Sequence, residues 1–325
     1  MTPSWWRRHG SAPAGDGVEQ SAQDTHVATA EYRTASIPAL PGAKPRDDEL
    51  DLFGLTHRGK VKKKNEDHFL LCTVHPTVVI HGTSLPDPAG LPLRGQRMAT
   101  IMLVADGVSS GGGGAEASRV AAEAITGYVS STLNCYHAAG SGEEQVFLDS
   151  LKAAALEAHS AVRSEGAAHP EIRKMATTLT LVMAVWPWAY AVQVGDSRCY
   201  VYTEHGLRQV TKDQTMAQDL VDRGALPPER LASSPFTHVL VSSIGGEEAK
   251  PEITRIDLDQ PGLVLLLCSD GLIKHVSDEQ IATEIGRMTS SEQLCQTLLN
   301  MAMDAGGSDN ITVIVARARR RNAAA

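Results

Sequence analysis

Apolar residues along this chain form short runs, and their spacing predicts many strands and few helices. Nearly continuous apolar runs at residues 98–105 and 263–268 predict buried strands. Shorter or alternating runs predict further strands at residues 52–55, 69–74, 178–185, 189–194, 199–203, 207–210 and 311–315. Residues 78–81 are a candidate extension of the first sheet.

Helical spacing is confined to two pairs of segments and one short piece. Residues 115–129 are rich in alanine, and residues 147–162 repeat apolar side chains every three or four positions. Ser277 and Ser290 each stand three residues before a glutamine, the capping-box pattern that opens a helix. A short helix is expected at residues 216–224.

The order of these elements predicts the fold class. Strands come first, then two helices, several hairpin strands, two more helices and a final strand. This is not the alternation of a parallel doubly wound sheet. It predicts an α+β fold in which two antiparallel sheets pack together and paired helices cover them.

Composition predicts one folded domain with flanking tails. Residues 1–47 are poor in large apolar side chains, so we expect a disordered leader there. The folded domain would span residues 48–318, and residues 319–325 would form a basic and alanine-rich tail.

Charge, hydropathy and cysteine content exclude several classes of protein. The 325 residues carry a formal net charge of -8, which argues against a nucleic-acid binder. No run approaches 18 apolar residues, so no membrane span is expected. The five cysteines are odd in number and contain no Cys-x-x-Cys pair, which favours reduced thiols in a cytoplasmic protein over disulfides or a zinc site.

Four aspartates lie where a predicted strand meets a turn: Asp67, Asp106, Asp270 and Asp309. A carboxylate at the mouth of an apolar strand is costly unless a partner compensates its charge. Four of them predict a shared positive partner. Because the offered ligands are oxygens, that partner is expected to be a hard cation such as Mg²⁺ or Mn²⁺.

Several other catalytic patterns are missing from the sequence. There is no P-loop, no His-Glu-x-x-His, no Gly-x-Ser-x-Gly, and no cysteine followed six positions later by arginine. Gly111–Gly114 is therefore interpreted as a flexible turn.

Seven short motifs stand in an order that resembles protein phosphatase 2C, the family of metal-dependent serine/threonine protein phosphatases. They are Asn65-Glu66-Asp67, Val104-Ala105-Asp106-Gly107, Ala176-Thr177-Thr178, Gly195-Asp196-Ser197-Arg198, Lys212-Asp213, Cys268-Ser269-Asp270-Gly271 and Asp309-Asn310-Ile311-Thr312-Val313. A single Asp-Gly has no specificity, but seven motifs in order are highly specific. The resemblance covers about residues 50–317.

The resemblance implies a four-layer α-β-β-α sandwich with two metal ions, Mn²⁺ or Mg²⁺, at one end. Asp106 would bridge both metals, and Asp67 and the Gly107 carbonyl would complete one side. Asp270 and Asp309 would hold the other side. The two ions would activate a water that attacks the phosphorus atom.

Further roles are implied around the metals. Glu66 would hold a metal-bound water, and Lys62 stands where the family usually has an arginine that grips the substrate phosphate. Lysine supplies charge without a bidentate fork, so weaker substrate binding is expected. Residues 213–250 fit a flap subdomain.

Two segments depart from the family pattern. Arg173 and Lys174 stand where many members have an acidic residue for a third metal, and residues 108–110 lack the usual glycines or histidine. Asp196 is interpreted as part of a structural turn with a contact to Arg198, an interpretation favoured over a role in the site, and the role of Asp213 stays open.

The resemblance implies hydrolysis of phosphoserine and phosphothreonine in proteins by the metal-activated water. The alternative is a catalytically weak or inactive phosphatase fold that binds phosphoproteins. The expected partners are phosphorylated proteins, in opposition to a Ser/Thr kinase, with no nucleic acid. A monomer in the cytoplasm is expected.

Overall fold

The computed structural model describes residues 42–81, 83–84, 86, 92–108, 112–131, 144–169, 172 and 174–319. They all belong to one compact unit, residues 40–325. The predicted leader lies outside the described residues except for residues 42–47. In that short piece, Lys44 donates to the Arg97 carbonyl, and Arg97 bonds to Asp47 at 2.5 Å.

Two antiparallel sheets of five strands form the centre of this unit. The first has the order β1-β10-β9-β6-β7, with β1 (Leu50–His57), β6 (Arg198–Thr203), β7 (Gly206–Gln209), β9 (Val264–Cys268) and β10 (Ile311–Ala318). The second has the order β2-β3-β4-β5-β8, with β2 (Asp67–Val74), β3 (Ala99–Asp106), β4 (Leu179–Val185), β5 (Trp188–Val194) and β8 (Glu252–Asp257).

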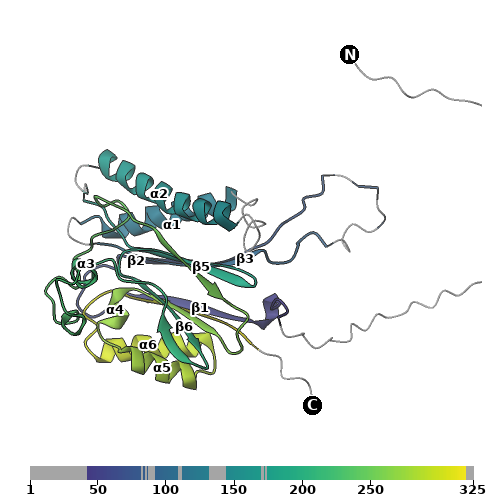
Figure 1. Cartoon of the computed structure of the whole chain (residues 1–325). Helices are drawn as coiled ribbons and strands as arrows, with labels where there is room; N and C mark the ends of the chain where they lie inside the picture. Colours follow the sequence, from purple (N-terminus) through teal and green to yellow (C-terminus); the bar gives the residue numbers. More distant parts are fainter. Residues whose placement is uncertain are drawn as a thin grey trace, which may run out of the picture. The chain divides into compact units, whose positions relative to one another are not determined.

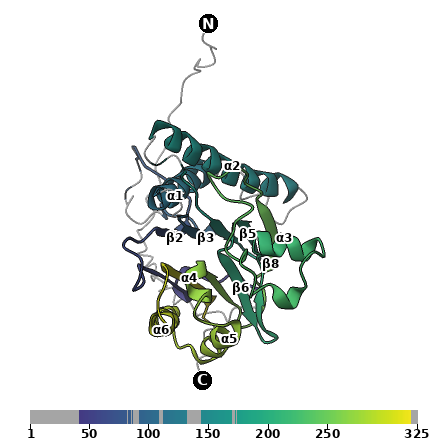
Figure 2. The same cartoon turned by 90° about the vertical axis from the view of Figure 1, so that its left-hand side faces the viewer.

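Two pairs of helices cover the outer faces of the two sheets. The helices among the described residues are α1 (Gly114–Ser131), α2 (Glu144–Ala168), α3 (Met216–Asp222), α4 (Asp270–Ile273), α5 (Asp278–Arg287) and α6 (Ser291–Asp304). In Figure 1, α1 and α2 lie against the sheet of β2, β3 and β5, and α5 and α6 lie against the sheet of β1 and β6. Figure 2 shows the same layers from the side that carries α3 and α4.

Three apolar cores correspond to this layering. One joins α1 and α2 to the second sheet, one joins α5 and α6 to the first sheet, and the third fills the space between the sheets. In the middle core, Met102 and Val104 of β3 meet Leu267 of β9 and Ile314 of β10. The predicted α-β-β-α sandwich is confirmed.

The sequence prediction differs from the structure at the edges of the second sheet. Residues 78–81 form no strand, and Val78 and Val79 are 60% and 69% exposed. Strand β8 was not predicted, because only Ile256 in it is buried and its other positions do not show an apolar alternation. The capping box at Ser277 is complete, whereas Gln293 bonds back to the Thr289 amide.

Two further expectations concern the described part of the chain. None of its helices is long and apolar enough to cross a bilayer. Its four cysteines, Cys72, Cys199, Cys268 and Cys295, are free thiols. Burial raises the pKa of Cys199 and of Cys295 to about 12, which keeps these thiols protonated.

Candidate metal centre

The four predicted aspartates come together at one end of the sandwich. Asp67 begins β2 and lies directly opposite Asp106, the last residue of β3. Asp270 begins α4 after β9, and Asp309 stands two residues before β10. Because β9 and β10 are paired neighbours, their ends bring Asp270 and Asp309 to the same edge of the first sheet.

Asp67 joins the two sheets at this end. Its Oδ2 accepts hydrogen bonds from the Ser269 hydroxyl at 2.8 Å and the Thr312 hydroxyl at 2.7 Å. Its Oδ1 is buried and has no hydrogen-bond partner among the described residues. Burial, with added repulsion from Asp270 and Asp309, raises the pKa of Asp67 to about 6. A buried carboxylate oxygen without a partner is a position where a cation or a water can supply the missing interaction.

Asp106 is fixed through its backbone. Its amide donates to the Thr178 hydroxyl at 3.0 Å, and its carbonyl accepts from the Thr178 amide at 2.8 Å and the Thr177 hydroxyl at 2.9 Å. The Thr-Thr motif thus positions this aspartate. Burial, followed by repulsion from Asp67, raises the pKa of Asp106 well above its usual value.

Gly107 sits where no side chain fits. A Cβ there would lie 2.3 Å from the Gly114 carbonyl oxygen and 2.6 Å from the Glu66 carbonyl oxygen. The Gly107 amide donates to the same Glu66 carbonyl at 3.1 Å. The backbone of the Asp106–Gly107 turn is therefore packed directly against the segment that carries Glu66 and Asp67.

Asp309 lies between two lysines. The Lys62 ammonium is 2.8 Å from its Oδ1, and the Lys274 ammonium is 2.6 Å from its Oδ2. Lys274 is also 2.6 Å from Asp270 Oδ2. Burial would raise the pKa of Asp309, but the bonds from Lys274 and Lys62 outweigh it, and the pKa is lowered. Sequence reasoning missed Lys274, although Asp270 and Lys274 have the helical i, i+4 spacing.

The loop that carries Lys62 and Glu66 is anchored by Asn310. The Asn310 side-chain amide donates to the carbonyls of Arg58 and Lys64, both at 2.9 Å, and its oxygen accepts from the Glu66 amide at 2.9 Å. The Asp-Asn motif therefore supplies one candidate ligand and the support for the neighbouring loop.

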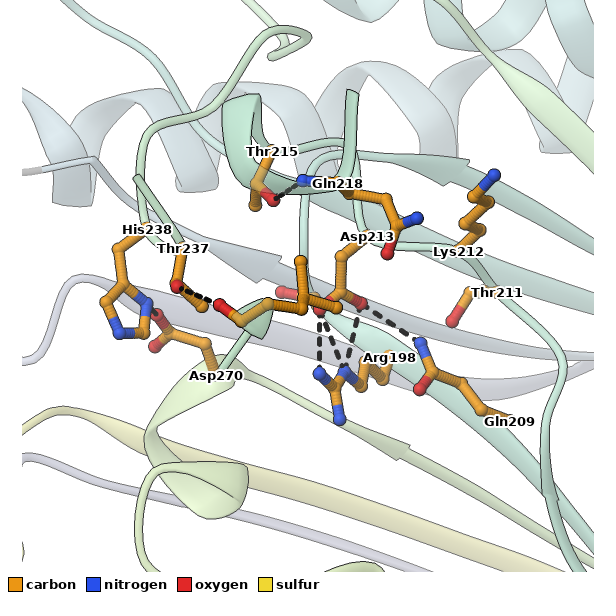
Figure 3. Close-up of polar contacts among 12 residues, drawn as sticks. Arg198, Gln209, Thr211, Lys212, Asp213, Thr215, Gln218, Thr237, His238 and Asp270 are labelled. Carbon is orange, nitrogen blue, oxygen red and sulfur yellow. Dashed lines mark hydrogen bonds and ion pairs between the residues drawn. The ribbon is translucent and has the colours of Figure 1, made fainter. Parts of the chain in front are cut away.

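The turn at Asp196 differs from its prediction. Figure 3 shows Arg198 paired with Asp213, with Nε 2.9 Å from Oδ1 and Nη2 2.7 Å from Oδ2. Asp213, and not the expected Asp196, is therefore its hydrogen-bonded partner. Asp196 is buried beside Asp270 and Asp213, and burial together with their charges raises its pKa to about 8.

Asp196 belongs instead to a cluster that sequence reasoning missed. Asp196, His238 and Asp270 each offer a ligand atom within 4.8 Å of the others. His238 comes from residues 213–250, and Figure 3 shows its ring facing Asp270, with Nδ1 3.7 Å from Oδ2. Because these three residues come from distant segments of the chain, no local spacing in the sequence could predict the cluster.

The residues present suit a hard divalent cation. They offer carboxylate oxygens at Asp67, Asp106, Asp270 and Asp309, and the partnerless Asp67 Oδ1 is a position where a cation would supply the missing charge. Ser109, Ser110 and Arg173, discussed above as departures, lie outside the described residues. Lys174 is exposed.

Comparison with known protein families gives a match to the model described as protein phosphatase 2C, over residues 91–311. Among curated proteins, the serine/threonine protein phosphatase PstP of Mycobacterium tuberculosis is 37% identical over 171 residues, which are 52% of this chain and 32% of PstP. Protein phosphatase PhpP of Streptococcus pneumoniae is 32% identical over 142 residues, 43% of this chain and 57% of PhpP. The chain thus spans about a third to just over half of these relatives.

Solved structures agree on the fold. The crystal structure of M. tuberculosis PstP matches with a TM-score of 0.65 and 28% identity, covering 83% of this chain and 99% of that one. The PstP catalytic domain in complex with two manganese ions matches with a TM-score of 0.61 and 27% identity, covering 83% and 98%. Stp1 of Staphylococcus aureus, at 20% identity and a TM-score of 0.67, shows the shared fold alone.

Proposed function

Because the chain belongs to the protein phosphatase 2C family, we propose that it hydrolyses phosphoserine and phosphothreonine in proteins with the help of two divalent cations. The observation that carries the proposal is the set of four aspartates at one end of the sandwich, with the buried Asp67 Oδ1 lacking a partner among the described residues. The similarity to PstP, solved with two manganese ions, supports the number and kind of cation.

We assign the candidate ligands to two cation positions. Asp67 and the Gly107 carbonyl would hold one cation, Asp270 and Asp309 the other, and Asp106 would reach both. When bound, such a pair of ions supplies an activated water and neutralises charge on the transferred phosphoryl group.

The chain's own residues would bind and orient the substrate. Lys62 is 35% exposed and faces the site beside Asp309, so its ammonium can attract a phosphate dianion. Glu66 lies on the loop anchored by Asn310, next to the start of α1, where its carboxylate can orient a water. His238, which faces Asp270 from the proposed flap at residues 213–250, can contact a bound phosphopeptide.

The proposal extends to the compartment, the oligomeric state and the source of the substrates. We propose that the protein acts as a cytoplasmic monomer on proteins phosphorylated by a Ser/Thr kinase. The free thiols of the described cysteines support a reducing compartment.

The test is hydrolysis of phosphoserine, phosphothreonine and phosphotyrosine peptides by the purified protein, with Mn²⁺, with Mg²⁺ and with EDTA. We expect phosphate release from the first two peptides only when metal is present, and its loss in Asp106→Asn. Asp149→Asn, at an exposed position of α2, is the control for a lost surface charge. Metal-dependent peptide binding without turnover would instead establish the binding-module alternative.

A further inference from the structure

Lys274 occupies the position between the two carboxylates proposed for the second cation. Its ammonium is 2.6 Å from Asp270 Oδ2 and 2.6 Å from Asp309 Oδ2, and its side chain is only 23% exposed. Three hydrogens on one ammonium can serve both oxygens at once. The lysine is therefore a bridge across the same gap that a metal ion would span.

The two sides of the site are compensated unequally. Asp309 has both oxygens engaged, since Oδ1 also meets the Lys62 ammonium at 2.8 Å and the Asn310 amide at 2.9 Å. On the other side, Asp67 Oδ1 is buried without a partner in the described part of the chain. One half of the site thus carries uncompensated negative charge, and the other half holds positive charge of its own.

The backbone around Lys274 is fixed, so the bridge is built into the fold. The Lys274 amide bonds to the Asp270 carbonyl at 3.0 Å. The neighbouring His275 Nε2 accepts from the Ser308 amide at 2.9 Å, which ties the segment after α4 to the turn before Asp309. Only the flexible stem of the side chain is free to move the ammonium out of the gap.

We infer that Lys274 is a built-in competitor of the second cation, which binds only when the ammonium leaves Asp270 and Asp309. A divalent ion between Asp270 and Asp309 would compete with the ammonium for the Oδ2 atoms, and two positive charges in one gap repel each other. The two cations should therefore bind with unequal affinity, the Asp67 side first. This inference rests on the proposed function and concerns the order in which its metals bind.

The test is isothermal titration calorimetry of Mn²⁺ into metal-free protein. For the parent chain we expect two binding events, one of them weak. In Lys274→Met, which keeps the length of the side chain without its charge, the weak event should tighten by about tenfold or more, because no charge-assisted hydrogen bond has to break first. Lys274→Arg, which keeps the charge, should leave the second event weak.

Two controls make the result specific. Lys63→Met removes one charge from an exposed lysine nearby and should leave both events unchanged. Lys274→Gln removes the charge but keeps a hydrogen-bond donor, and it replaces the methionine variant if that variant does not fold. Without Mn²⁺, Lys274→Met should melt at a lower temperature than the parent chain, because Asp270 and Asp309 then face each other without a cation.

An unchanged second event in both uncharged variants would overturn the competitor role while leaving the proposed function intact. The same holds for two equally tight events in the parent chain. If no variant binds Mn²⁺ at all, the proposed metal-dependent function fails together with the inference.

Discussion

Asp67 and Asp106 stand directly opposite each other on neighbouring strands, at the point where β2 begins and β3 ends. Like charges at facing positions of a sheet are destabilising. The pair is therefore a cost to the folded protein without metal and a ligand set for the protein with metal. Removal of either charge should affect the two states in opposite directions.

Asp67→Asn should stabilise the metal-free protein at pH 8. The pKa of Asp67 is raised to about 6, above its unfolded value, so the folded state binds a proton more tightly than the unfolded chain. The associated stability is present at low pH and is lost as pH rises through about 6. Asparagine avoids this loss, so its stabilising effect should be about 2 kcal/mol larger at pH 8 than at pH 4.5.

Urea unfolding in EDTA at both pH values measures this difference. Asp149→Asn, a surface control, should change stability at neither pH. A variant less stable than the parent at pH 8 would contradict the prediction. In Mn²⁺, the order should reverse, since the parent gains more from the ion.

Gly107→Ala should abolish metal-dependent activity and destabilise the fold. Its Cβ would meet the backbone oxygens of Gly114 and Glu66, at 2.3 Å and 2.6 Å, and neither oxygen can move without displacing the start of α1 or the segment of Glu66 and Asp67. Gly127→Ala in α1 is the matched control, because its Cβ meets nothing within 4 Å. That control should stabilise the protein by about 0.5–1 kcal/mol. Thermal melting and Mn²⁺ calorimetry distinguish the two; equal behaviour would refute the packing argument.

Asp213→Ala should be among the more damaging substitutions outside the metal centre. It removes the carboxylate that is hydrogen-bonded to the Arg198 guanidinium, which is 23% exposed, and leaves only Asp278 nearby, at 4.0 Å. The expected loss is about 2 kcal/mol, and the double variant with Arg198→Leu should recover part of it. Asp219→Ala breaks a comparable but exposed pair with Arg223 and should cost at most about 1 kcal/mol. Chemical denaturation of the parent chain, the two single variants and the double variant measures these losses. Similar losses of stability in Asp213→Ala and Asp219→Ala would contradict the prediction.

Lys62→Arg should lower KM for a phosphothreonine peptide by about three- to tenfold, because a guanidinium binds phosphate through two parallel hydrogen bonds. Lys62→Ala should raise KM. Steady-state kinetics at saturating Mn²⁺ measures both, with Lys63→Arg as the control. If KM is the same in all of them, position 62 does not contact the phosphate.

The sequence predicted those parts of the fold that depend on local pattern. Buried strands such as β3 and β9 are continuous apolar runs, and Asp106 and Asp270 stand at or just after their ends. The strands and the positions of these aspartates could therefore be predicted from the sequence. Strand β8 could not, because it lies at the edge of its sheet and buries only Ile256. A strand was wrongly expected at residues 78–81 because Val78 and Val79 are apolar, although both side chains are exposed.

The sequence predicted that the four aspartates would lie together, and the structure brings them to one end of the sandwich. Lys62, expected there from the family resemblance, lies beside Asp309. The roles of these residues as ligands and phosphate contact stay predictions. The partners of Arg198 and Asp196 depend on which hairpins lie side by side, so the sequence pairing of these two neighbours was wrong. The Lys274 ammonium bonds to Asp309, 35 residues along the chain, and a contact between such distant residues cannot be predicted from local spacing.

The pairing of β1 with β10 has a consequence for synthesis of the protein. Strand β10 lies between β1 and β9, so residues 311–318 form an interior strand of their sheet. While a ribosome is still translating residues before this segment, β1 has an open edge and Asp309 has no strand to fix it. The first sheet can close only after residue 318 has emerged, so a nascent chain should form the second sheet, with Asp67 and Asp106, first and should complete the set of candidate metal ligands with Asp270 and Asp309 last.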